Sequence, residues 1–197
     1  MKYKLLFCFF FVTVSIALFA QEVKISHGPY IQAIGQTEAT VIWTTDNDAV
    51  SWVEVAPAGD NSFYGSEHPK YYQTKNGNRV IGKLHKINIA GLKPGTEYRY
   101  RIFSKAVLEY AGHRVLYGNI ASSNVYTKKP LRFQTLDSSK ESISFLVLND
   151  IHGRNDDLIA LSKDIRFGKT DLVFFNGDMV SSMENEKQFF EGFMDNA

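Results

Sequence analysis

Short segments in which apolar and polar residues alternate fill the chain from residue 23 to about residue 135. Ala39, Val41 and Trp43, for example, fall on one face of their segment. Alternation with a period of two predicts half-buried strands, each with one face toward water. The pattern recurs at residues 52–55, 87–89 and 97–102, and turn-forming residues separate the strands at 46–48, 57–60, 76–78 and 91–95. Many short strands separated in this way predict an antiparallel β-sandwich.

The segment 91–98, Gly-Leu-Lys-Pro-Gly-Thr-Glu-Tyr, joins a tight turn directly to a strand. An inward-facing tyrosine at this place is typical of the tyrosine corner of immunoglobulin-like sandwiches. We therefore expect the Tyr98 phenol to bond to nearby backbone and to fix the crossing between the layers. The segment resembles the fibronectin type III family, in which a similar sequence precedes a late strand.

After the polar residues 137–141 the pattern changes, and we expect the sandwich to occupy residues 21–137 and a second unit to begin at 138. Residues 143–148 form a nearly continuous apolar run, residues 172–175 form a second one, and both predict buried parallel strands. Between them, a helix capped by Asn155 or Asp156 would place Leu158, Leu161 and Ile165 on one face and end near Arg166 and Gly168. Ser181 and Glu184 predict a capping box for a second helix that carries Phe189, Phe190, Phe193 and Met194.

Polar residues follow both apolar runs. Asp150 and His152 come after the first, and Asp178 after the second. A right-handed crossover brings the carboxyl ends of both strands to one edge of the sheet, where ligands bind. Two carboxylates and an imidazole suit a divalent cation of the Mn, Fe or Zn class, and Gly153 and Gly177 allow close approach. Each motif alone has a plainer interpretation as a turn, but the joint pattern favours a metal site.

The other histidines, His27, His68, His85 and His113, lack partners at the spacing of metal ligands and are expected to be surface or sheet residues.

The start of the chain predicts a secretory signal peptide over residues 1–20. Lys2 and Lys4 precede an uncharged stretch, residues 5–19, that ends at Ala20. This stretch is shorter than the ~20 residues of a membrane span, so no transmembrane span is expected in the mature chain, and we expect a secreted or periplasmic protein. Cys8 lies inside the stretch and is the sole cysteine, so the mature chain forms no disulfide.

Charge excludes one class of partner. The sequence holds 22 Lys and Arg against 21 Asp and Glu, a formal charge of +1. A field this weak does not attract nucleic acid, so no nucleic-acid partner is expected.

The second unit resembles the calcineurin-like metallophosphoesterase family, which opens with Asp-x-His and Gly-Asp motifs at such strand ends. The first unit is similar to the N-terminal domain of purple acid phosphatases, on the basis of residues 27–32 and 39–43. The resemblance implies two metal ions of the Mn, Fe or Zn class, with Asp150 and His152 binding the first and Asp178 bridging both. Arg154 is a candidate phosphate contact, and the alternative is a solvated loop arginine. True purple acid phosphatases carry Gly in place of His152 and Tyr in place of Ser181, so no purple colour is expected.

The family's later Gly-Asn-His-Asp/Glu motif does not occur before Ala197. We therefore expect the N-terminal part of a secreted metal-dependent phosphoesterase, incomplete in its catalytic domain and hydrolysing phosphate esters when whole. The general-acid His that the family implies would lie after residue 197. The alternative is a non-catalytic extracellular binding or spacer module with a remnant α/β tail, using Trp52, Tyr71 and Tyr72 as an exposed contact surface.

Overall fold

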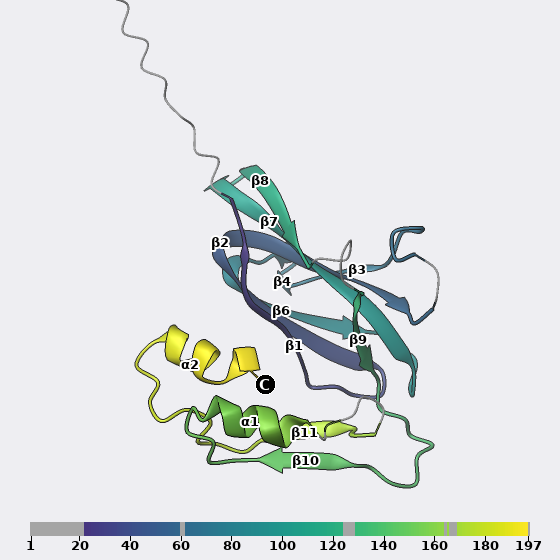
Figure 1. Cartoon of the computed structure of the whole chain (residues 1–197). Helices are drawn as coiled ribbons and strands as arrows, with labels where there is room; N and C mark the ends of the chain where they lie inside the picture. Colours follow the sequence, from purple (N-terminus) through teal and green to yellow (C-terminus); the bar gives the residue numbers. More distant parts are fainter. Residues whose placement is uncertain (1–21, 60–61, 124–128, 164, 166–168, 197) are drawn as a thin grey trace, which may run out of the picture.

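The computed structural model describes residues 22–59, 62–123, 129–163, 165 and 169–196 (Figure 1). The predicted signal peptide lies outside the described residues. Strands of the N-terminal part form a largely antiparallel sheet that closes into a sandwich, as predicted. Its strands are β1 (Ile25–Gln32), β2 (Glu38–Pro57), β3 (Lys70–Tyr72), β6 (Ile81–Ala90), β7 (Glu97–Ala111), β8 (Arg114–Ser122) and β9 (Leu131–Gln134). The short strands β4 (Thr74–Lys75) and β5 (Asn78–Arg79) pair with each other in a separate two-stranded sheet.

The strand β2 runs through both layers of the sandwich. Its residues 40–45 pair with β1, and residues 38–44 and 49–50 pair with β6. Residues 49–57 pair with β7 on the other edge, and β3 pairs with residues 52–54. The turn predicted at residues 46–48 is therefore wrong. The backbone continues there with a shift of register against β6 between Thr44 and Ala49. The Asp46 carboxylate accepts a hydrogen bond at 2.7 Å from the backbone N–H of Lys24, the residue before β1.

The alternating apolar residues meet in one core, which confirms their predicted inward face. Trp43 is fully buried and donates its indole N–H to the Ser104 hydroxyl at 2.9 Å, so its polar atom is satisfied. The other buried members of this cluster are Ala39, Val41, Val53, Val55, Ile87, Ile89, Leu92, Tyr98, Tyr100, Ile102 and Phe133.

The opposite face of β7 is covered, contrary to the prediction of one wet face per strand. Arg101 is buried because its guanidinium donates to the Ser123 carbonyl and the Ser122 hydroxyl, both at 3.0 Å. Its charged group also lies 4.7 Å from the ring centre of Phe103. Arg99 is buried beside it and donates to the Gly59 carbonyl. Carbonyl and aromatic partners compensate the buried charge.

The predicted contact surface is occupied by neighbours within the sandwich. Trp52 is half-buried and stacks on Phe103 with ring centres 4.9 Å apart and planes 3° from parallel. Tyr72 lies against the same indole, and Tyr71 packs against the core. The expectation that these three side chains are exposed is therefore wrong, because neighbouring side chains of the sandwich cover part of each ring.

The predicted tyrosine corner is present. The Tyr98 hydroxyl accepts the backbone N–H of Lys93 at 2.8 Å, and the phenol itself is buried. This bond holds the 91–95 turn against the start of β7.

Replacing Tyr98 with Phe is expected to lower the free energy of unfolding by about 1 kcal/mol, the net value of one hydrogen bond. Urea denaturation measures the change. Tyr110→Phe, at an exposed ring near the end of β7, is the matched control and is expected to have no effect. Equal stabilities of the two variants would contradict a structural role for the corner.

Burial lowers the pKa of His85 to about 4. The imidazole packs against Trp43 and bonds to the Thr45 hydroxyl at 2.9 Å. In the unfolded chain a histidine takes up its proton near pH 6.5. The unfolded state therefore binds more protons as the pH falls from about 6.5 toward 4, and the folded state loses stability over that range.

His85→Gln is expected to flatten this pH dependence, which amounts to roughly 3 kcal/mol between pH 6.5 and 4. Urea denaturation at a series of pH values measures it. His113→Gln, at an exposed position in the β7–β8 turn, is expected to keep the wild-type slope. A His85→Gln variant with an unchanged slope would show that other groups cause the acid lability.

The C-terminal part is a small α/β segment, as predicted. It contains β10 (Phe145–Leu148), α1 (Asn155–Ser162), β11 (Leu172–Phe175), α2 (Glu186–Gly192) and the 3-10 helix η1 (Met194–Asn196). The strands β10 and β11 are parallel, with Leu148 opposite Phe175. Helix α1 contributes the fully buried Leu158, while Phe145 on β10 remains 58% exposed. The prediction that both strands are buried is therefore wrong for one face of this two-stranded sheet.

Both predicted helix starts need correction. Arg154, not Asn155 or Asp156, occupies the cap position of α1, without a side-chain bond. This helix ends at Ser162, before Ile165, and Leu161 within it is half exposed instead of buried. Arg166 and Gly168 lie outside the described residues. The second helix begins later than predicted, because Asn185 and Gln188 form its capping box in place of Ser181 and Glu184.

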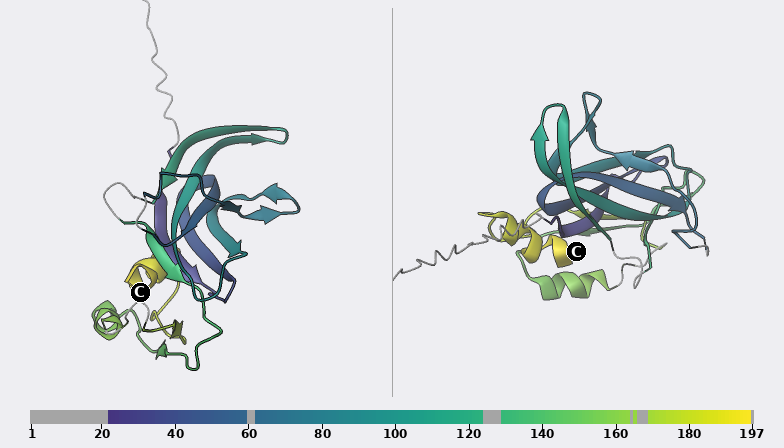
Figure 2. Two further views of the ribbon diagram at one scale, coloured as in Figure 1. Left: turned by 90° about the vertical axis from the view of Figure 1, so that its right-hand side faces the viewer. Right: turned by 90° about the horizontal axis from the view of Figure 1, so that it is seen from above.

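Helix α2 and η1 lie between the sandwich and the unit formed by β10, α1 and β11 (Figures 1 and 2). Within the described part of the chain, no helix has the length and apolar character needed to cross a membrane.

Candidate metal centre

Two loops carry the candidate ligands, and backbone hydrogen bonds join these loops beyond the ends of the strands. The His152 amide donates to the Asp178 carbonyl at 2.8 Å, and the Gly153 amide donates to the Met179 carbonyl at the same distance. Asp150 donates to the Gly177 carbonyl at 3.3 Å. The pairing of β10 with β11 thus extends into the loops and sets the distance between them.

Asp150, His152 and Asp178 all have left-handed backbone conformations, with φ of 57°, 53° and 51°. Such angles are uncommon for residues other than glycine and cost of order 1–3 kcal/mol each. Gly153 and Gly177 also have positive φ. Both loops therefore turn sharply at the residues that carry the polar side chains, and strain of this kind gathers at functional sites.

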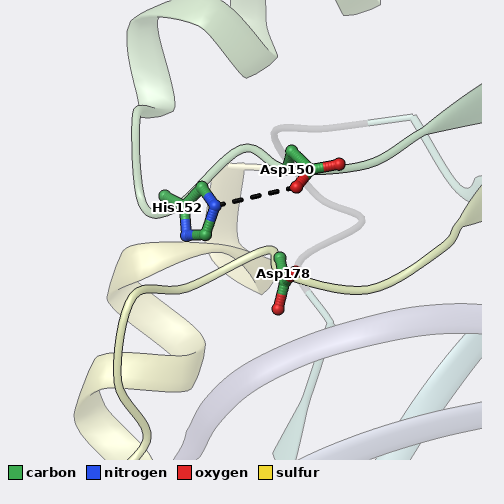
Figure 3. Close-up of side chains that lie close together, drawn as sticks. All are labelled: Asp150, His152 and Asp178. Carbon is green, nitrogen blue, oxygen red and sulfur yellow. Dashed lines mark ion pairs between the residues drawn. The ribbon is translucent and has the colours of Figure 1, made fainter.

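The three side chains lie close together beyond the strand ends, with His152 facing Asp150 and Asp178 on the neighbouring loop (Figure 3). One ligand atom from each lies within 4.8 Å of the other two, and His152 Nε2 is 3.8 Å from Asp150 Oδ1. All three are exposed, so solvent and substrate reach them. Among the described residues, this is the group of three His, Cys, Asp or Glu side chains close enough to hold an ion.

This donor set fits a transition-metal ion. Ligands with bonds of about 2.1 Å to one ion lie up to about 4.2 Å apart. The 3.8 Å separation of His152 and Asp150 falls inside that limit, and all three pairs lie within 4.8 Å. Carboxylate and imidazole together suit Mn, Fe or Zn.

Nearby polar groups support the two loops. The Ser181 hydroxyl donates to the His152 carbonyl at 2.9 Å, which ties the second loop to the first. Asn149 contacts the Asp150 carboxylate through its side-chain amide. Sequence reasoning did not assign Asn149, although its place next to Asp150 is a signal for such a contact.

Arg154 bends back over its own loop. Its guanidinium donates to the carbonyls of Asp150 and Ile151 at 3.0 and 3.1 Å, and it lies 3.4 Å from the Asp157 carboxylate. The side chain is largely exposed. Arg154 therefore shares the Asp150 loop, but its donors contact backbone in this structure.

The other histidines are surface or sheet residues, as expected, with one addition. His27 of β1 contacts a carboxylate far along the chain, since its Nδ1 lies 2.9 Å from Asp195 Oδ2. The local spacing could not reveal this pair, because its members are 168 positions apart.

His152→Gly is expected to raise the free energy of unfolding of the metal-free protein by about 1 kcal/mol, since glycine adopts φ near 53° without strain. His152→Ala is the matched control, because it removes the imidazole but keeps the strained Cβ. Urea denaturation in the presence of EDTA compares the two variants. If both have the same stability, backbone strain at this position is not the cause.

Comparison with known proteins gives two family matches. The purple acid phosphatase N-terminal domain family matches residues 27–129, and the calcineurin-like phosphoesterase family matches residues 143–196. Among solved structures, the sensor domain of the anti-sigma factor RsgI4 from Pseudobacteroides cellulosolvens is similar, at 18% identity, covering 62% of this chain and 96% of that one with a TM-score of 0.28. No curated protein matches the chain.

Proposed function

The chain belongs to the purple acid phosphatase N-terminal domain family, with a calcineurin-like phosphoesterase segment after that domain, and from this premise we propose that it is a secreted metal-dependent phosphoesterase. The observation that carries the proposal is the convergence of Asp150, His152 and Asp178 from two strand ends.

Each residue of the cluster has a role in this proposal. Asp150 and His152 would hold one ion and Asp178 would serve both that ion and a second one, with Mn, Fe and Zn as the suitable metals. When bound, the ions supply Lewis-acid polarisation of a phosphoryl oxygen and neutralise developing charge. A histidine binds a metal ion through a neutral ring nitrogen, which is the role proposed for His152. The two aspartates supply the negative charge that attracts a cation to the site.

The Arg154 guanidinium is the proposed contact for a phosphate oxygen. It is anchored to the Asp150 carbonyl through Nη2, and a guanidinium carries further donors that match the geometry of phosphate. Its large exposure allows the side chain to turn toward a bound ester.

Export is the proposed location of the protein. The basic, apolar and small-residue regions of residues 1–20 support removal of a signal peptide. The site would then work in the periplasm or outside the cell.

The first test of the proposal is metal binding. Isothermal titration with Mn²⁺ is expected to detect binding that Asp178→Asn weakens more than about tenfold, since it removes a charged ligand. Asp48→Asn, at an exposed carboxylate of β2, is the matched control and is expected to bind as the wild type does. Equal affinity for all three proteins would refute the site.

The second test is hydrolysis. Cleavage of p-nitrophenyl phosphate with Mn²⁺ is expected to be slower in His152→Ala than in the wild type. Equal, near-zero rates in both would favour, for the chain as given, the alternative of a non-catalytic sandwich module.

A further inference from the structure

The sandwich contacts the C-terminal segment through a small cluster on β1. Both carboxylate oxygens of Asp195 in η1 are engaged there, one by the Tyr30 hydroxyl at 2.7 Å and the other by His27 Nδ1 at 2.9 Å. The His27 ring also stacks on Phe190 of α2, with centres 4.0 Å apart and planes 2° from parallel. We call these four residues, His27, Tyr30, Phe190 and Asp195, the β1 clamp.

The geometry of β1 is specialised for this contact. Residues three apart on a regular strand point to opposite faces, yet His27 and Tyr30 both reach Asp195. The pairing of β1 with β2 shifts its register between Ile25 and His27 and again between His27 and Tyr30, which turns both side chains to one side.

Gly28 makes this approach possible. Its φ is +88°, and a Cβ at this position would lie 3.0 Å from the Ile42 carbonyl oxygen and 3.2 Å from the Trp43 side chain. Only glycine lets β1 lie this close to β2 in that conformation.

The clamp is a narrow contact. Beside it, an open groove of about 650 Å³ separates the sandwich from α2, with Ile42 and Leu84 on one wall and Phe189 and Met194 on the other. Interactions between the sandwich and α2 are therefore concentrated at the clamp.

The other side of α2 and η1 packs directly beside the candidate ligands. Phe193 joins a buried cluster with Ile151 and Met179, which neighbour His152 and Asp178 in sequence. The Asn155 side chain donates to the Glu191 carbonyl at 3.1 Å. A continuous chain of contacts thus runs from β1 through α2 to both metal loops.

From these contacts we propose that His27 and Tyr30 are positioning residues for the metal centre: the sandwich holds α2 and η1 in place, and these hold the two ligand loops at the separation that binds a cation. This inference rests on the proposed function. The Tyr30 phenol suits the task, because burial and the Asp195 carboxylate both raise its pKa and keep it protonated as a donor.

The test is Mn²⁺ titration of the full chain with Tyr30→Phe, Asp195→Asn and the double variant. Each single variant is expected to bind Mn²⁺ between about twofold and thirtyfold more weakly than the wild type, the range for mutations that act through a coupling network. The double variant is expected to weaken binding by less than the product of the two single effects, since Tyr30 and Asp195 share one hydrogen bond. Circular dichroism at the titration temperature checks that each variant is folded, and His27→Phe, which keeps the stack on Phe190, replaces any variant that is not.

Tyr110→Phe and Asp48→Asn control for the loss of a hydroxyl and of a carboxylate away from the clamp. Asp178→Asn separates the two proposals. If it leaves Mn²⁺ affinity unchanged, the metal centre itself is refuted. If it weakens binding while the clamp variants lower only the melting temperature and bind Mn²⁺ as the controls do, the clamp is merely structural and the positioning role is overturned.

Discussion

The parallel register between β10 and β11 is the constraint on which the candidate metal centre depends. With Leu148 opposite Phe175, the hydrogen bonds of the sheet continue into the loops as far as Gly153 and Met179. The ligands therefore sit on backbone that is already paired. A slip of one residue would move Asp178 along the edge and turn alternate side chains to the other face.

Local strain accompanies this arrangement. Asp150, His152 and Asp178 adopt angles that glycine would adopt at less cost. Packing beneath the loops provides the compensation, since Leu148, Ile151 and Leu158 form a buried cluster with Phe193. The proposed metal-binding role and local stability are thus opposed at the same residues, and the small core beneath them maintains the geometry.

The sandwich is stable through interactions of its own. Trp43, Ser51 and Ser104 form a buried hydrogen-bonded group among apolar side chains, and Arg101 finds carbonyl, hydroxyl and aromatic partners. Its contact with the C-terminal segment depends on fewer groups. In the β1 clamp, the Asp195 carboxylate bonds to His27 and Tyr30, and the His27 ring stacks on Phe190. A rigid first domain can in this way orient a small second unit that buries little surface.

Local patterns in the sequence determined the strands of the core, the tyrosine corner and the approach of Asp150, His152 and Asp178, because periodicity and strand-end spacing act over a few residues or one crossover. Tertiary structure alone decided that β2 continues through residues 46–48 and that Arg99 and Arg101 are buried. It also decided that His27 meets Asp195, 168 positions away. These features depend on which surfaces pack together in the folded chain. A short stretch of sequence does not determine which distant segment will cover it.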